Sequence, residues 1–378
     1  MTLAIQELRR RRRVSIDDVE TFLADKTFPL VEGQSVTFVW RGEADGVRLR
    51  NWIYGLPSSQ PLKRLEGTDL WYLSIDLPPG SRVEYKFEVY QGERVELVPD
   101  PLNAHVATDP MGTNSVVHGH GYVVPDFTLL DPNARPGTLE TLVLASAAFG
   151  EPRPLQVYLP ARFRPTRRYP LLVVHDGSDF LRYAGLKTVL DNLIHRLEIP
   201  PLVAAMTDSP RRLVEYADDP RHAEFLAGEV VPALEARYPL ARTHGARCLL
   251  GASFGAVASL AAAWRNPGVF GNLALLSGSF AFTDIGAHDR GPVFDPVVEF
   301  VNAFRANPGR PSEHIYLACG IYESLIYYNR SMLPLLQETG MTVRFTEVRD
   351  GHNWENWRDR LREGLSWLFP GPLWMVYE

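Results

Sequence analysis

The sequence predicts an α/β protein in which a mostly parallel central sheet is flanked by helices, with a small β-sandwich before it. Two observations lead to this prediction. Between about residues 36 and 122, short segments alternate apolar and polar side chains and are separated by turn-rich stretches, as in antiparallel strands. After about residue 138 the pattern changes, and continuous apolar segments alternate with longer helical ones, which is typical of a parallel sheet covered on both faces.

Length and composition indicate a soluble protein of two domains. The chain has 378 residues, 45% hydrophobic and 22% charged, which suffices for a large core. The net charge of −6 argues against a nucleic-acid partner, because a phosphate-binding surface needs an excess of basic residues. We see no signal peptide and no apolar run long enough to span a membrane, so we expect a cytoplasmic protein. Cys248 and Cys319 lie in apolar segments, as core thiols in a reducing compartment would.

The first predicted domain, residues 1–125, is an immunoglobulin-like sandwich with a short leading helix. Arginines 9–13 are expected on the solvated face of that helix. Strands are expected at 36–42, 47–53, 71–77 and 82–90. In the last of these, apolar residues at odd positions should face the core. The charged residues at even positions should face water; these are Arg82, Glu84, Lys86 and Glu88.

The second predicted domain, residues 126–378, follows a linker that contains several prolines. It opens with a hairpin of the segments 141–146 and 155–160. Further strands are expected at 170–178, 202–206, 247–252, 273–279, 314–320 and 342–348. Helices are expected at 185–197, 224–238, from 254, at 296–306, before Gly340 and after the segment GHNW.

The pentapeptide GASFG, residues 251–255, lies between a predicted strand and a predicted helix. At such a junction, G-x-S-x-G is the nucleophile elbow of the α/β-hydrolase fold, in which a strained turn exposes the serine hydroxyl above the sheet. Ser253 is therefore the candidate nucleophile of this predicted α/β-hydrolase domain.

Two further residues have the chain order of a catalytic triad. Glu323 follows the strand at 314–320, and His352 follows the strand at 342–348. In this fold the nucleophile precedes the acid, and the acid precedes the histidine. His352 would take the serine proton, and Glu323 would orient the imidazole. Asp350 is the competing acid, although it lies only two residues from His352, which makes the far ring nitrogen awkward to reach.

An oxyanion hole needs two preorganised donors. We expect the backbone amide of Phe254, directly after the nucleophile, and the amide of Ser178, in the turn after an early strand. His175 and Asp176 in that turn do not predict a metal site, because an adjacent His-Asp pair lacks the further ligands that zinc requires. No cofactor or metal is expected.

Four longer segments resemble the enterochelin esterase branch of the putative esterase family. They are LLVVHDGSDF, FLAGEVVPALEARYPL, GASFGAVASLAAAWRNPGVFGNLALLSGSF and GHNWENWRDRL. The resemblance implies Ser253 as nucleophile, His352 as base, and an acid in the loop that holds Glu323. It also implies a cofactor-free enzyme that hydrolyses the trilactone of a ferric catecholate siderophore in the cytoplasm and so releases iron.

A polyanionic substrate with aromatic arms requires cations and aromatic faces around the site. Arg211, Arg212 and Tyr216 follow a strand near the catalytic edge, and Trp354 follows the histidine, so all four are candidate substrate contacts. Two aromatic residues of the first domain are further candidates, namely Trp52 and Tyr54.

Other functions remain open at this stage. A carboxylesterase or a feruloyl-type esterase would share this architecture, since fold does not choose a substrate. An acyltransferase would use the same acyl-enzyme. A non-catalytic protein that binds a carbohydrate or a partner is the alternative from another class, although the retained serine and histidine favour an enzyme. The sequence leaves the oligomeric state open.

Overall fold

The computed structural model describes residues 2–282 and 291–371, and the chain divides into two compact units. The first unit runs to Val124 and also includes two short segments from far along the chain, 320–324 and 348–353. The second unit contains the remainder from Pro125 onward. The main division thus falls at 124/125, whereas nothing in the sequence pattern predicted the two short segments.

The first unit begins with two helices, α1 (Ala4–Arg9) and α2 (Ile16–Ala24). Ser15 and Asp18 form a capping box at the start of α2, in which each side chain accepts from the backbone amide of the other residue. The prediction that the arginine run lies on one leading helix is wrong. Helix α1 ends at Arg9, and residues 10–13 belong to the connection to α2.

Two antiparallel sheets make up the rest of the first unit. One has the order β1-β2-β6-β5, and the other has the order β4-β3-β7-β10-β9 with β8 also paired to β7. Side chains of β2, β3, β6 and β7 share one hydrophobic core, so the sheets pack face to face as a sandwich. The strands are β1 (Leu30–Glu32), β2 (Ser35–Arg41), β3 (Gly46–Asn51), β4 (Ser59–Pro61), β5 (Lys63–Arg64), β6 (Leu70–Asp76), β7 (Arg82–Gln91), β8 (Arg94–Val98), β9 (Val106–Asp109) and β10 (Gly112–His118).

The charged face of β7 differs from its prediction. Val83, Tyr85, Phe87 and Val89 are buried in the core, as expected. On the other face, however, Arg82 is 0% exposed and Glu88 only 9% exposed. Glu88 is covered by arginines 48 and 50 of the neighbouring strand, and Arg82 pairs with the segment 348–353. A long-range segment therefore covers a face that alternation alone assigns to water.

The second unit contains one mixed sheet, with the order β11-β12-β14-β13-β15-β16-β17-β18 among the described residues. The hairpin β11–β12 is antiparallel, and the strands β13 to β17 pair in parallel, which confirms the predicted α/β-hydrolase arrangement. The strands are β11 (Thr138–Ser146), β12 (Glu151–Leu159), β13 (Leu171–His175), β14 (Val203–Thr207), β15 (Arg247–Ala252), β16 (Asn272–Leu276), β17 (His314–Gly320) and β18 (Thr342–Val348).

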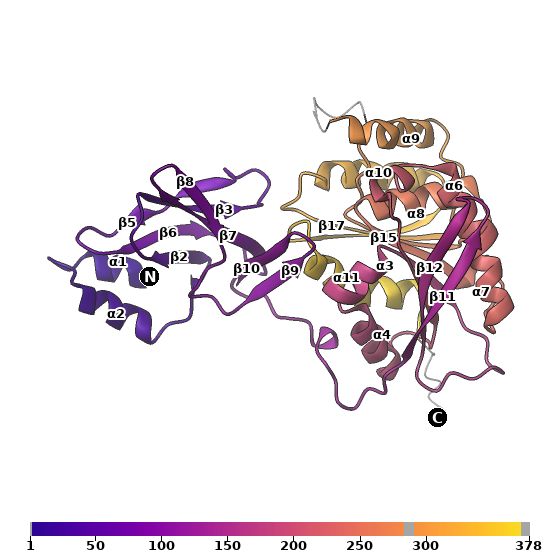
Figure 1. The fold of residues 1–378 in the computed structure, drawn as a ribbon, viewed down its shortest axis with the longest axis horizontal. Helices are drawn as coiled ribbons and strands as arrows, with labels where there is room; N and C mark the ends of the chain where they lie inside the picture. Colours follow the sequence, from indigo (N-terminus) through magenta and orange to yellow (C-terminus); the bar gives the residue numbers. More distant parts are fainter. Residues whose placement is uncertain (1, 283–290, 372–378) are drawn as a thin grey trace. The chain divides into compact units, whose positions relative to one another are not determined.

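Helices cover both faces of this sheet (Figure 1). Helices α3, α4 and α11 pack on one face, where they share a core with alternate residues of the strands, and α6 and α8 lie on the other. The helices are α3 (Gly177–Tyr183), α4 (Leu186–His195), α5 (Arg212–Glu215), α6 (Pro220–Glu224), α7 (Val231–Arg237), α8 (Phe254–Arg265), α9 (Asp295–Ala306), α10 (Ile326–Glu338) and α11 (Trp354–Leu368).

The long helix predicted at 224–238 is present, and it contains a π-helical turn. A π-helical segment, Phe225–Val230, separates α6 from α7. The other predicted helices are present as well, and the side chains of Cys248 and Cys319 are buried. None of the helices in the described ranges combines the length and the apolar composition needed to cross a bilayer.

Candidate active site

Ser253 lies at the sharp turn between β15 and α8. Its φ is +57° and its ψ is −119°, a conformation that an L-residue adopts only under strain. The surrounding structure holds this turn, since the Ser253 amide donates to the carbonyl of Leu276 at 2.9 Å. The Ser253 Oγ lies 3.1 Å from the Oγ of Ser279, a neighbour that sequence reasoning missed because it follows a different strand, β16.

The two glycines of the pentapeptide are required by close packing. A Cβ added to Gly251 would lie 2.1 Å from the carbonyl oxygen of Gly255. A Cβ added to Gly255 would lie 3.1 Å from the Cβ of His175, so the turn after β13 lies against the elbow. These contacts explain why glycine occurs two positions before and two positions after the strained serine.

The two predicted oxyanion donors have different environments. Phe254 is the first residue of α8, so its amide is one of the helix-terminal donors without an intrahelical acceptor. The amide of Ser178, in contrast, donates to Asp208 Oδ1 at 3.1 Å, and the Ser178 hydroxyl donates to the same carboxylate. The assignment of Ser178 as oxyanion donor therefore does not fit this structure, because a carboxylate already accepts that hydrogen bond.

The predicted substrate contacts Arg212 and Tyr216 both hydrogen-bond to Asp176, although the Arg212 side chain is still 34% exposed. Arg212 donates through Nε and Nη2 to Asp176 at 2.8 and 2.7 Å, and Nη2 also lies 3.4 Å from the Ala252 carbonyl. Arg212 thus ties the turn after β13 to the elbow. Tyr216 is 0% exposed, and its hydroxyl accepts from the Asp176 amide. It therefore presents no surface to a substrate, which corrects the prediction for Tyr216.

The other predicted contacts have mixed exposure. Arg211 is half exposed, and its Nε lies 3.5 Å from Glu215 Oε1, so it remains a candidate. Trp354 begins α11 and packs against Phe180, Tyr183 and Trp357, which is mainly a core position. In the first unit, two aromatic side chains are close to half exposed, those of Trp52 and Tyr54.

Glu323 and His352 are hydrogen-bonded to each other. Their atoms Oε2 and Nδ1 are 2.7 Å apart. The Glu323 side chain is buried, and its other oxygen accepts from the Gly320 amide at 2.8 Å. The His352 side chain is 38% exposed. A buried carboxylate on Nδ1 leaves the opposite ring nitrogen, Nε2, as the one that accepts a proton, as in a catalytic triad.

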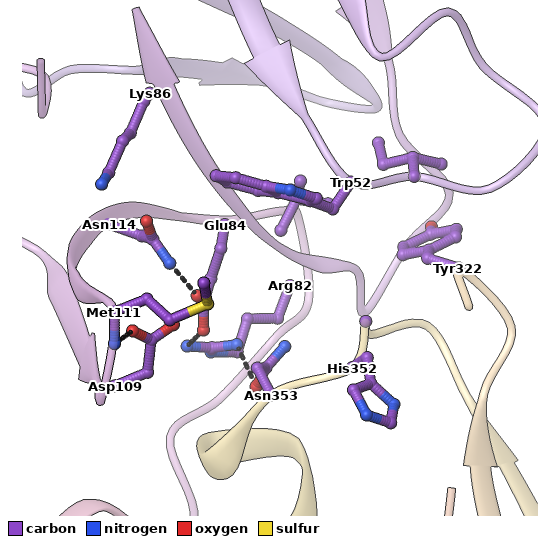
Figure 2. Close-up of a pocket in the computed structure, with 13 residues that line it drawn as sticks. Trp52, Arg82, Glu84, Lys86, Asp109, Met111, Asn114, Tyr322, His352 and Asn353 are labelled. Carbon is purple, nitrogen blue, oxygen red and sulfur yellow. Dashed lines mark hydrogen bonds and ion pairs between the residues drawn. The ribbon is translucent and has the colours of Figure 1, made fainter. Parts of the chain in front are cut away.

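Asp350, the competing acid, belongs to a different network. Its Oδ1 accepts from the Gly351 amide at 2.7 Å and from Asn353 Nδ2 at 2.8 Å. The same oxygen lies 3.2 Å from Arg82 Nη1. Arg82 also donates to Asn353 and Glu84, as Figure 2 shows. Burial raises the pKa of Asp350 to about 6, against the effect of Arg82, so the carboxyl is ionised at neutral pH. Of the two candidate acids, only Glu323 is bonded to His352 by this geometry.

Comparison with known proteins identifies the family. Residues 146–368 match the model of the putative esterase family, and residues 35–122 match the model of the enterochelin esterase N-terminal domain. The chain belongs to the putative esterase family.

Proteins that are similar to this chain over most of its length include enterobactin esterases. The iron(III) enterobactin esterase of Escherichia coli strain K12 is 24% identical, with 87% of this chain and 90% of the relative covered. A crystal structure of the Shigella flexneri enterobactin esterase in the presence of enterobactin has a TM-score of 0.75 at 20% identity, covering 92% of this chain and 97% of that one. The ferric enterobactin esterase of Salmonella typhimurium also has a TM-score of 0.75, at 21% identity, with 92% and 98% covered. The protein is a carboxylic ester hydrolase of the α/β-hydrolase fold.

A buried histidine pair lies behind the elbow of the esterase. His175 Nε2 and His222 Nε2 are 3.0 Å apart, and both side chains are buried. Burial lowers the pKa of His222 to about 3. The pKa of His175 is lowered well below its ordinary value, mainly by burial and to a smaller extent by the nearby His222. Both rings are therefore neutral at physiological pH. Among the described residues, no group of three or more His, Cys, Asp or Glu side chains is arranged to hold a metal ion.

Proposed function

We propose that this esterase hydrolyses the ester bonds of a ferric catecholate siderophore, of the trilactone type, and that Ser253, His352 and Glu323 are its catalytic residues. The observation that carries the chemistry is the hydrogen bond between Glu323 and His352, together with the strained conformation of Ser253. The choice of substrate is supported by similarity to enterobactin esterases over both domains.

In this proposal His352 Nε2 removes the proton of the Ser253 hydroxyl as the oxygen attacks the ester carbonyl. The proton then passes to the leaving alcohol, and an acyl-enzyme remains on Ser253. Water, activated by the same imidazole, cleaves the acyl-enzyme. Glu323 holds the tautomer with Nδ1 protonated and stabilises the imidazolium that forms in both steps.

The tetrahedral intermediates need donors for their negative oxygen. The Phe254 amide is the first. For the second we propose the amide of Gly177 in place of Ser178, because Gly177 opens α3 and the turn before it packs against Gly255. A Cβ at Gly177 would lie 2.2 Å from the Cβ of Met206, so this position requires glycine. An exposed cation, Arg211, remains the proposed contact for the anionic substrate.

Opening the trilactone would weaken iron binding by a simple physical route. Three catecholates attached to one trilactone ring bind the metal with a high effective concentration of ligands. Each ester bond that is hydrolysed lowers that effective concentration. Hydrolysis therefore favours release of iron without a resident cofactor. We place the reaction in the cytoplasm, a reducing compartment that suits two buried cysteines in apolar strands.

The test is hydrolysis of ferric enterobactin, p-nitrophenyl butyrate and methyl ferulate by the wild type and by Ser253→Ala, followed by chromatography. We expect serine-dependent cleavage of the trilactone with a kcat/KM well above that of either simple ester. Activity confined to the simple esters would keep Ser253 as nucleophile and refute the siderophore substrate.

A further inference from the structure

A cavity of about 370 Å³ lies within the first unit, and His352 forms part of its wall (Figure 2). Its size is within the range of small-molecule sites. The other walls come from the residues after β3, from the charged face of β7, from the β9–β10 hairpin and from the segment 351–353. A ligand in this cavity would therefore contact the residue that we propose as the catalytic base.

Two charged groups of the cavity wall have no ion pair among the described residues, the ammonium of Lys86 and the carboxylate of Asp109. Glu84 is paired with Arg82 and also accepts from Asn114 Nδ2 at 2.8 Å. Asp109 accepts from the Met111 amide. Lys86 points to the same cavity from β7, and within the described ranges it has no ion pair with a carboxylate. The carboxylates before and after it on the strand, Glu84 and Glu88, are bonded to arginines.

The cavity also exposes apolar and aromatic surface. Trp52 is 46% exposed and Met111 is 94% exposed, although both are large apolar side chains. The loop that carries Trp52 is held in place, because Asn51 accepts from the Ile53 amide and donates to the Pro57 carbonyl. An indole and an ammonium group that line the same cavity are suited to an electron-rich, anionic aromatic ring. The thioether of Met111 adds a polarisable contact to the ring edge.

We propose that this cavity is the subsite for one anionic aromatic arm of the ester substrate, with Trp52 stacking on the ring and Lys86 pairing with its oxygens. The proposal rests on the proposed function, since it assigns an arm of that substrate to a defined place beside His352. It also gives the N-terminal sandwich a direct part in substrate selection, through Trp52, Lys86 and Met111.

The kinetic test compares Lys86→Gln and Trp52→Ala with the wild type. We expect the ratio of kcat/KM for ferric enterobactin to that for p-nitrophenyl butyrate to fall at least about tenfold in each variant, mainly through KM, as for loss of one charged or stacked contact. Lys86→Arg should keep most of the ratio. Lys63→Gln, on β5 and outside the cavity, is the matched control and should keep all of it.

A binding test separates this proposal from the proposed function. Calorimetry would measure binding of 2,3-dihydroxybenzoyl-serine to Ser253→Ala and to the double variant Ser253→Ala/Lys86→Gln. Binding at least about tenfold weaker in the double variant supports the subsite even if the wild type fails to cleave the trilactone. Equal binding by both proteins, or an unchanged kinetic ratio in Lys86→Gln, overturns the subsite and leaves the proposed hydrolysis standing.

Discussion

Arg82 and Asp350 form a buried ion pair across 268 positions of sequence, with Arg82 Nη1 3.2 Å from Asp350 Oδ1. Arg82 is the first residue of β7, and its amide also donates to the Arg349 carbonyl at 2.9 Å. The sandwich strand thus holds the segment that carries His352 by both side-chain and backbone contacts. A buried ion pair is costly to break, because the remaining charge is left in a poorly solvated place.

We expect Arg82→Met to be more destabilising than Asp350→Asn. The first change leaves two carboxylates, Asp350 and Glu84, without their cation, and should lower the free energy of unfolding by about 3–5 kcal/mol. The second leaves Arg82 bonded to Glu84 and Asn353, and should cost roughly 1–3 kcal/mol. Urea unfolding at pH 7 measures both. Equal costs would mean that Glu84 contributes nothing to the network.

Replacement of Ser253 by alanine should abolish catalysis and leave the fold intact. We expect kcat for ester hydrolysis to fall by about 1,000-fold or more, as when a catalytic nucleophile is removed. The far-ultraviolet circular dichroism spectrum and the Tm should change little. A fluorophosphonate probe, which reacts only with an activated serine, should label the wild type but not the variant. Labelling that persists in Ser253→Ala would locate the nucleophile elsewhere.

The acid assignment predicts an asymmetry between two carboxylates. Glu323→Gln should lower kcat by roughly 100- to 10,000-fold, because the amide favours the wrong imidazole tautomer. Its residual activity should exceed that of His352→Ala. Asp350→Asn should retain most of the activity of any molecules that remain folded. Steady-state kinetics at 20 °C or below, with equal concentrations of folded protein for each variant, would test which carboxylate is the catalytic acid. A crippling Asp350→Asn beside a harmless Glu323→Gln would refute the role of Glu323.

The buried histidine pair predicts acid sensitivity. Because the pKa of His222 is about 3 in the folded protein and about 6.5 when unfolded, the unfolded chain binds more protons between these values. The free energy of unfolding therefore falls as the pH drops through this window. Between pH 7 and pH 5, the stability advantage of the wild type over His222→Gln should shrink by roughly 2 kcal/mol. An advantage that is independent of pH would show that His222 titrates normally in the folded state.

Local sequence pattern was sufficient to predict much of the fold and two parts of the candidate site. Hydrophobic periodicity located β2, β3, β6 and β7 of the first unit and β11 to β18 of the second, whereas β1, β4, β5, β8, β9 and β10 were not predicted. The strand-to-helix junction located the strained Ser253. Chain order placed Glu323 and His352 at the ends of β17 and β18, where a hydrogen bond joins them. These features depend on residues within a few positions of each other, or on the regular order of the fold.

Features that depend on distant partners could not be predicted in this way. Alternation along β7 assigns Arg82 to water, since it carries no information about the segment 348–353 that covers it. The Ser178 amide looked available because Asp208, its acceptor, lies 30 positions away. Tyr216 was assigned to the substrate by its place after a strand, and only packing shows that it is buried. Ser279 was not predicted because it follows β16 and lies near Ser253 only in the folded chain.

The composition of the first unit bears on how such enzymes can be recombined. Residues 320–324 and 348–353, which carry Glu323 and His352, belong by their contacts to the same compact body as the sandwich. A chimera cut only at the linker would separate Arg82 from its native partner Asp350. The first unit is therefore built from three separate stretches of sequence. An exchange of N-terminal domains between relatives should give a stable protein only when residues 320–324 and 348–353 are exchanged together with the domain.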